Sequence, residues 1–217
     1  MKHLILFLYA VMVVGCQTHL PERPDVPAPD QPTVALIPTA TIETKKNITG
    51  VTIIPAIGHR GVARIIAALG NDGTVIYSLD GTVTWRNGTP AKLVAFYQGT
   101  LIIYRDHEAA TRLDRYRIHR NGTAELVETA SPSPIAATTI QRTAYAPLGP
   151  AHIDANAIQL QSCRIEMNKT VTALAAADRM LPLLGDMTII VATDDGNILA
   201  APRAYFDEFG CALTPAR

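Results

Sequence analysis

Short Asp-Gly and Asn-Gly turns recur along this chain and separate runs of β-branched and aromatic residues. Type I′ hairpin turns need positive φ at both central residues, so such pairs between strand formers are the strongest short-range signal of a β-hairpin. They stand at Asn71-Asp72-Gly73, Asp80-Gly81, Asn87-Gly88, Asn121-Gly122 and Asp194-Asp195-Gly196. The sequence from Gly50 onward therefore predicts a succession of antiparallel hairpins.

The stretch RLDRYRIHRNGTAELVETA, residues 112–130, is similar to the blade motif of Tol-type periplasmic β-propellers. A propeller blade takes about 40 residues in four strands, and a ring usually needs about four to eight blades. The strands expected here, roughly eleven or twelve, would supply about three blades. We therefore predict a mainly β fold of antiparallel hairpins, forming a sandwich or a partial propeller-like sheet assembly.

One segment departs from the strand pattern. In TVTALAAADRMLPLLG, residues 170–185, alanines, leucines and Met180 are grouped at helical spacing. Pro182 would end or kink a helix, because proline lacks the backbone N–H and clashes with the preceding turn. We predict one short helix near residues 172–184.

The beginning of the chain has the plan of a secretory signal. Lys2 precedes an apolar run, Leu4 to Val14, whose length lies within the ~7–15 residues of a signal h-region. A membrane-spanning helix needs about 20 apolar residues. Val13-Val14-Gly15-Cys16 resembles the lipobox of bacterial lipoproteins, with valine where leucine is commonest. The resemblance implies that residues 1–15 are a signal peptide and that Cys16 carries the lipid.

The same resemblance implies a location. Each buried CH₂ of an acyl chain contributes about 0.8 kcal/mol, so several chains on Cys16 would anchor the protein to a membrane. Aspartate after the lipidated cysteine retains enteric lipoproteins in the inner membrane, whereas this chain has Gln17. We expect the outer membrane, with the protein facing the periplasm. An ordinary secretory signal and a buried N-terminal helix are the alternatives.

Prolines follow the proposed anchor at close intervals. Proline favours extended polyproline II structure, so this segment is expected to act as a semi-rigid tether or to bind another protein or the cell wall. The prolines are Pro21, Pro24, Pro27, Pro29, Pro32 and Pro38. We assign residues 16–47 to the lipid anchor and tether, and residues 48–217 to a single β-rich domain large enough for its own core.

Charge and composition limit the partners. The formal net charge is zero, with 48% apolar, 18% charged and 6% aromatic residues. The chain lacks the basic excess that neutralises phosphates, so we expect no nucleic-acid binding. Attachment to a membrane is expected through the lipid at Cys16 alone.

Two cysteines remain once Cys16 is assigned to the anchor. Cys163 and Cys211 form an even pair in an oxidising compartment, and we predict a disulfide between them. A redox-active pair is typically close in sequence, as in Cys-x-x-Cys. Metal binding is disfavoured because no histidine stands at ligand spacing from either cysteine.

One predicted strand and its turn are rich in basic residues. Arg112, Arg115, Arg117, His119 and Arg120 stand within nine positions and are expected to face few acids. Alternation puts Arg115 and Arg117 on one face and Asp114, Tyr116 and Ile118 on the other. If the second face packs inward, the arginines project into solvent and form a possible partner-binding surface. A solvated edge protected from aggregation by its charge is the alternative.

Motifs of catalysis are absent from the sequence. It has no Gly-x-Ser-x-Gly, His-Glu-x-x-His, phosphate-binding glycine loop or Ser-x-x-Lys. Side chains of Asp106-His107-Glu108 would not converge on a strand, because neighbours point to opposite faces. His152 and Asp154 lack a third metal ligand, and Asp194-Asp195-Gly196 fits a hairpin turn better than a calcium loop. We predict that the protein is not an enzyme and that it binds no cofactor and no metal.

The sequence favours a non-enzymatic binding or assembly component of a bacterial envelope or secretion complex, with a protein partner. Two alternatives stay open. One is a periplasmic enzyme whose site is assembled from distant residues such as His59, Asp106 and His152. The other is a ligand-binding or inhibitor lipoprotein.

Overall fold

The computed structural model describes residues 33–54, 63–97, 99–107, 110–131, 151–160, 163–181 and 185–202. Within these ranges the chain forms sixteen β-strands in four sheets of four strands each. The described ranges contain no helix that is long and apolar enough to cross a membrane. The predicted mainly β fold of antiparallel hairpins is confirmed.

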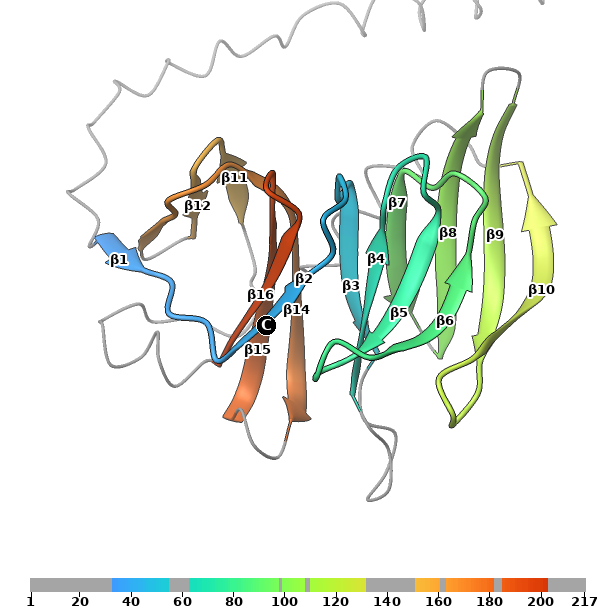
Figure 1. The fold of residues 1–217 in the computed structure, drawn as a ribbon, viewed down its shortest axis with the longest axis horizontal. Coiled ribbons are helices and arrows are strands. Elements are labelled where there is room, and N and C mark those ends of the chain that lie inside the picture. Colours follow the sequence, from blue (N-terminus) through green and yellow to red (C-terminus); the bar gives the residue numbers. More distant parts are fainter. Residues whose placement is uncertain are drawn as a thin grey trace, which may run out of the picture. The chain divides into compact units, whose positions relative to one another are not determined.

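Two sheets are meanders in which every consecutive pair of strands is antiparallel (Figure 1). The β3–β6 sheet contains β3 (Gly50–Ile54), β4 (Arg64–Ala68), β5 (Thr74–Ser78) and β6 (Val83–Asn87). The β7–β10 sheet contains β7 (Leu93–Tyr97), β8 (Thr100–His107), β9 (Ala110–Ile118) and β10 (Ala124–Ala130).

The other two sheets each take their outermost strand from residues 33–43. In one, β11 (His152–Asp154), β12 (Ala157–Gln159) and β13 (Arg164–Glu166) are joined by β1 (Thr33–Ala35), which runs parallel to β13. In the other, β14 (Val171–Leu181), β15 (Gly185–Thr193) and β16 (Asn197–Pro202) are joined by β2 (Ala40–Glu43), antiparallel to β16. We call residues 33–43 the strap.

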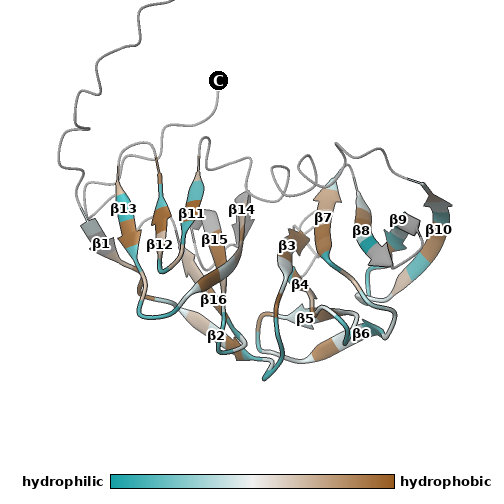
Figure 2. Cartoon of the chain, turned by 90° about the horizontal axis from the view of Figure 1, so that it is seen from above, coloured by the Kyte–Doolittle hydropathy of each residue, from teal (hydrophilic) through white to brown (hydrophobic). Residues whose placement is uncertain are grey.

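Three apolar cores join the sheets face to face, in the order seen in Figure 2. The β11–β13 sheet packs on the β14–β16 sheet through residues that include Ile158, Ile165, Leu174, Ile189 and Val191. The β14–β16 sheet packs on the β3–β6 sheet through residues that include Ala175, Ile190, Val51, Ile65 and Val75. The β3–β6 sheet packs on the β7–β10 sheet through residues that include Ile66, Ile76, Val94, Leu101 and Ile103.

One strand of each sheet lies next to a strand of the neighbouring sheet. Contacts connect β11 with β14, β14 with β3, and β3 with β7. At Gly50 on β3, an added Cβ would lie 3.1 Å from the Cα of Leu93 on β7, so the missing side chain permits this close approach. Four-stranded sheets that are antiparallel except for the β1–β13 pair, packed in sequence through β11, β14, β3 and β7, form a partial propeller-like assembly.

The helix predicted near residues 172–184 is wrong, since residues 171–181 form the strand β14. Its residues alternate between two cores: Ala173 and Ala175 face one, and Leu174 and Ala176 face the other. Helix propensity favours alanine by less than about 1 kcal/mol per residue. Burial on both faces outweighs that preference, and the small alanine side chains let two sheets approach the strand closely.

The tether boundary predicted at residue 47 is also wrong, because the strap belongs to the folded part. Ile42 on β2 is 5% exposed and fills the core between β16 and the β3–β6 sheet. Pro38 lies between β1 and β2, where its missing N–H interrupts no ladder. Residues 1–32, with the predicted signal peptide, Cys16 and most of the tether, lie outside the described residues.

Most of the predicted hairpins at glycines are confirmed, but the predicted type I′ geometry is wrong, because the Asp or Asn before each of these glycines has no positive φ and only the glycine is left-handed. Gly73, Gly81, Gly122 and Gly196 follow hairpin strands with positive φ, as does Gly99 between β7 and β8. Asn87-Gly88 instead connects two sheets, because β6 and β7 are not paired with each other. A local turn signal does not say whether the following strand joins the same sheet.

Candidate functional site

A set of charged side chains, with one histidine, lies on one side of the β9–β10 strand pair, and we call it the charged face. Its members are Arg115, Arg117, His119, Glu125 and Glu128. Arg115 donates a hydrogen bond from Nη1 to Glu128 Oε2 at 2.8 Å, and both side chains are about half exposed. His119 Nε2 lies 3.4 Å from Glu125 Oε2. The face carries charges of both signs.

Strand register explains why these residues meet. Arg117 stands opposite Glu125 in the ladder, and Arg115 stands opposite Glu128. The predicted alternation is confirmed, because Asp114 and Tyr116 are buried while Arg115 and Arg117 are exposed. The expectation that the basic residues face few acids is wrong, since the two glutamates of β10 lie directly across from them. No ion pair joins Arg117 to another side chain of the described ranges.

Two of the five predicted basic residues lie apart from the charged face. Arg112 is exposed but stands opposite Arg105, on the side of the sheet to which Asp114 and Tyr116 belong. Arg120 is in the turn between β9 and β10, and its carbonyl accepts a hydrogen bond from Arg64 Nη2 at 2.9 Å. The structure therefore brings together Arg115, Arg117 and His119 only.

Apolar side chains are exposed on β10, although Leu126 stands opposite Tyr116 in the ladder and so belongs to the side away from the charged face. Leu126 and Val127 on β10 are 52% and 57% exposed, and β10 is the outermost strand of its sheet. The ladder with β9 shifts register between Leu126 and Glu128, which leaves a β-bulge at this position. Bulges interrupt the regular edge of a sheet and so oppose indiscriminate pairing with other chains.

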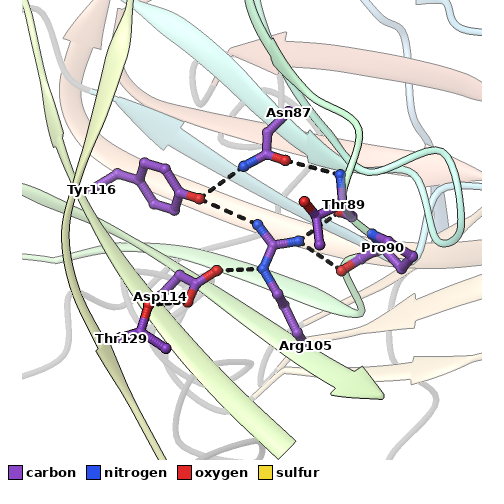
Figure 3. Close-up of polar contacts among 7 residues, drawn as sticks. All are labelled: Asn87, Thr89, Pro90, Arg105, Asp114, Tyr116 and Thr129. Atoms are coloured by element: carbon purple, nitrogen blue, oxygen red, sulfur yellow. Dashed lines mark hydrogen bonds and ion pairs between the residues drawn. The ribbon is translucent and has the colours of Figure 1, made fainter. Parts of the chain in front are cut away.

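A buried polar network lies on the opposite, inward side of the same strands (Figure 3). Arg105 of β8 pairs through Nε with Asp114 of β9, and its Nη1 donates to the carbonyl oxygens of Thr89 and Pro90 at 2.6 and 2.8 Å. Thr129 Oγ1 donates to the second carboxylate oxygen of Asp114 at 2.8 Å.

Tyr116 extends this network to the neighbouring sheet. Its hydroxyl oxygen accepts from Arg105 Nη2 at 3.3 Å and from Asn87 Nδ2 at 2.8 Å, and Asn87 belongs to β6. The Tyr116 ring packs edge-on against Trp85 with centroids 5.4 Å apart. Buried charges are tolerated when they are paired and hydrogen-bonded, so this network holds the two sheets in one arrangement.

The turn that follows β9 is also held by the β3–β6 sheet. Thr84 Oγ1 donates to Gly122 O at 3.2 Å, beside the bond from Arg64 to the turn. Gly122 has φ of 87°, and an added Cβ would lie 2.3 Å from Arg64 Nε. These contacts fix the end of the charged face at His119, next to the turn. Arg64 and Arg105 were not among the residues predicted from the sequence, where their signal is an arginine on the apolar side of a strand.

Cys163 is fully buried in the core between the β11–β13 and β14–β16 sheets. Its predicted disulfide partner Cys211 lies outside the described residues, as does the predicted lipidation site Cys16. The pairing and the lipidation stay predictions.

Other candidate residues lie at strand ends and turns. His152 and Asp154 are exposed on β11, and Asp154 Oδ2 accepts from Arg164 Nη1 at 3.1 Å. Asp106 and His107 end β8, but their side chains are not among those described, and His59 and Glu108 lie outside the described ranges. Asp194-Asp195-Gly196 forms the β15–β16 hairpin turn, as predicted. Among the described residues no three or more His, Cys, Asp or Glu side chains gather in a way that would hold a metal ion.

Comparison of the sequence with protein-family models and with curated proteins gave no match.

Proposed function

We propose that this protein is a non-enzymatic binding component of a bacterial envelope or secretion complex, with the charged face of β9 and β10 as its docking surface. The observation that carries the proposal is the exposure of Arg117, with no ion-pair partner in the described ranges, next to the outermost strand β10, on which Val127 is exposed at the bulge. Arginine and apolar side chains together are typical of protein interfaces.

The chemistry of the face favours a partner with acidic groups next to apolar ones. Arg115 is held by Glu128, so its guanidinium is partly neutralised before any partner arrives. Arg117 offers donors that suit a carboxylate, which a guanidinium binds through two parallel hydrogen bonds. Contact with Val127, which is exposed at the bulge of β10, would supply an apolar part of the interface.

Lipidation of Cys16 would place this surface at the outer membrane, facing the periplasm, with the proline-rich segment as a tether. This part of the proposal is supported by the resemblance of Val13-Val14-Gly15-Cys16 to a lipobox. Metabolic labelling with palmitate tests it directly: the wild type should be labelled and Cys16→Ser should not. A labelled Cys16→Ser protein would show that the anchor lies elsewhere.

Co-purification in mild detergent tests the docking surface. The double variant Arg115→Ser/Arg117→Ser should fold normally and lose the partners that the wild type retains. Arg112→Ser is the matched control, because it removes an exposed arginine from the same strand but not from the charged face. If the double variant keeps its partners, β9 and β10 form a solvated edge and not a docking surface.

Of the residues suggested for an enzymatic alternative, only His152 has a described side chain, and it is exposed on β11.

A further inference from the structure

A cavity of about 250 Å³ lies far from the charged face in the fold, between the strap and the turns that follow β13 and β15. One part of its wall is apolar and is formed by Ala35, Leu36, Pro38, Met167 and Leu199. The other part is polar and is formed by Glu166, Asn168, Lys169, Asp195 and Asn197. Small-molecule sites combine an apolar wall with a few placed polar groups in this way.

The size of the cavity limits the ligand. Drug-sized ligands occupy pockets of about 300–1,000 Å³. The cavity therefore suits a compact molecule of amino-acid size.

Asp195 is a fixed negative group at the polar wall. Thr193 Oγ1, which is buried, donates to Asp195 Oδ1 at 2.6 Å. This hydrogen bond, together with contacts to Asn197 and the charge of Lys169, holds the pKa of Asp195 below its ordinary value. The carboxylate is thus ionised at neutral pH, and only one of its oxygens is engaged by the threonine.

Lys169 and Asp195 are near each other without forming a tight ion pair. Lys169 Nζ lies 3.9 Å from Asp195 Oδ2, whereas a charge-assisted hydrogen bond is about 2.7–2.9 Å long. Glu166, by contrast, already accepts from Arg164 Nε at 2.7 Å. The charges available to a ligand are therefore one ammonium and one carboxylate, side by side.

We propose that this cavity binds a small zwitterion, an apolar α-amino acid, through Asp195, Lys169 and the apolar wall. The ligand's ammonium bonds Asp195, its neighbouring carboxylate bonds Lys169, and its side chain packs against Leu36 and Met167. The two charges of the ligand then alternate with those of Asp195 and Lys169. The long Lys169–Asp195 ion pair is replaced by short charge-assisted hydrogen bonds to the ligand.

The strap supplies part of the apolar wall, so ligand and strap stabilise each other. Leu36 and Pro38 lie between β1 and β2, whose partners are β13 and β16. A ligand that binds only when the strap is docked must favour the docked state by linkage. Bound ligand should therefore slow amide hydrogen exchange in residues 33–43.

Calorimetric titration of the full-length protein in detergent with leucine tests the proposal, alongside N-acetyl-leucine, which lacks the ammonium, and leucinamide, which lacks the carboxylate. Leucine should bind saturably, and both analogues should bind at least about tenfold more weakly, since each leaves a charged group of the protein without its partner. Asp195→Asn and Lys169→Met should weaken leucine binding to a similar degree. Asparagine keeps the turn chemistry of position 195, and methionine keeps the unbranched stem at position 169.

Lys46→Met is the matched control. Lys46 also pairs with an exposed aspartate, Asp72, at 3.1 Å, but neither residue lines the cavity. Its leucine affinity should equal that of the wild type. The proposal is overturned if folded protein shows no saturable binding at about 10 mM leucine, where a ligand with Kd of about 1 mM would be mostly bound. Equal binding of N-acetyl-leucine, or leucine binding without protection of residues 33–43, would overturn it as well.

Discussion

Arg105 and Asp114 form an ion pair inside the β7–β10 sheet, with side chains only 6% and 11% exposed. The pair is diagonal, because Arg105 stands opposite Arg112 in the ladder and Asp114 stands opposite Ile103. Each partner has further hydrogen bonds, so the other partner is not the only group that stabilises its buried charge. Asp114 lies on β9, on the side opposite Arg115 and Arg117. The pair therefore fixes the backbone from which these two arginines project.

Asp114→Ala should lower the free energy of unfolding by about 3–5 kcal/mol, because it leaves the Arg105 guanidinium buried without a counter-charge. Urea unfolding followed by circular dichroism measures the change. Asp72→Ala, which removes one partner of the exposed Lys46–Asp72 pair, should cost about 0–1 kcal/mol.

The double variant Arg105→Met/Asp114→Leu separates charge from packing. Replacing both members of a buried pair by apolar residues of similar size is often tolerated, so it should be less destabilising than Asp114→Ala alone. A double variant as unstable as the single one would show that the hydrogen bonds to Thr89 and Pro90 matter more than the charge.

Gly73→Ala and Gly99→Ala should differ strongly in stability, although both glycines have positive φ, 90° and 79°. Left-handed backbone costs an alanine roughly 1–2 kcal/mol, and this is the whole expected effect at position 99, where an added Cβ meets nothing within 4 Å. At position 73 the Cβ would lie 1.9 Å from Asn87 O, so the β5–β6 ladder must shift as well. Equal urea midpoints for the two variants would contradict this steric argument.

Local sequence rules predicted the hairpins because their cause is local. Gly73, Gly81, Gly122 and Gly196 adopt the positive φ that their turns require, whatever the rest of the fold does. Alternation along β9 likewise predicted which side chains of this strand point inward, and Tyr116 is buried as that pattern required.

Long-range pairing was beyond these rules. Thr39 Oγ1 donates to Ala200 O across 161 positions of the chain, and no local pattern near Pro38 indicates that the strap joins two distant sheets. The alanines of β14 were misassigned to a helix because burial on both faces depends on sheets formed elsewhere in the sequence. For the same reason, the sequence could not predict that glutamates stand opposite Arg115 and Arg117, because this depends on the register between β9 and β10.

Tyr77→Phe should make the protein less sensitive to alkaline pH. Burial raises the pKa of Tyr77 above its ordinary value of 10.0, while the positive charge of Arg86 lowers it by a smaller amount. A group whose folded pKa is raised contributes stability that is complete below its unfolded pKa and is lost as pH rises through the folded one. The urea midpoint of the wild type should therefore fall more steeply above about pH 10 than that of Tyr77→Phe. Parallel curves for the two proteins would mean that other groups cause the alkaline loss.

Cys163 and Cys211 should be recovered as one disulfide-linked peptide pair when the protein isolated from cells is digested without reduction. Cys163 is fully buried in the core between two sheets, so any thiol there must be alkylated after denaturation to be detected. A bridge over a loop of roughly 50 residues stabilises by about 4 kcal/mol on the chain-entropy estimate. Cys211→Ser should accordingly lower the urea midpoint under non-reducing conditions and have little effect in the presence of a reductant. Mass spectra showing both cysteines alkylated in unreduced protein would rule the bridge out, and would leave Cys163 as a core residue held by packing alone.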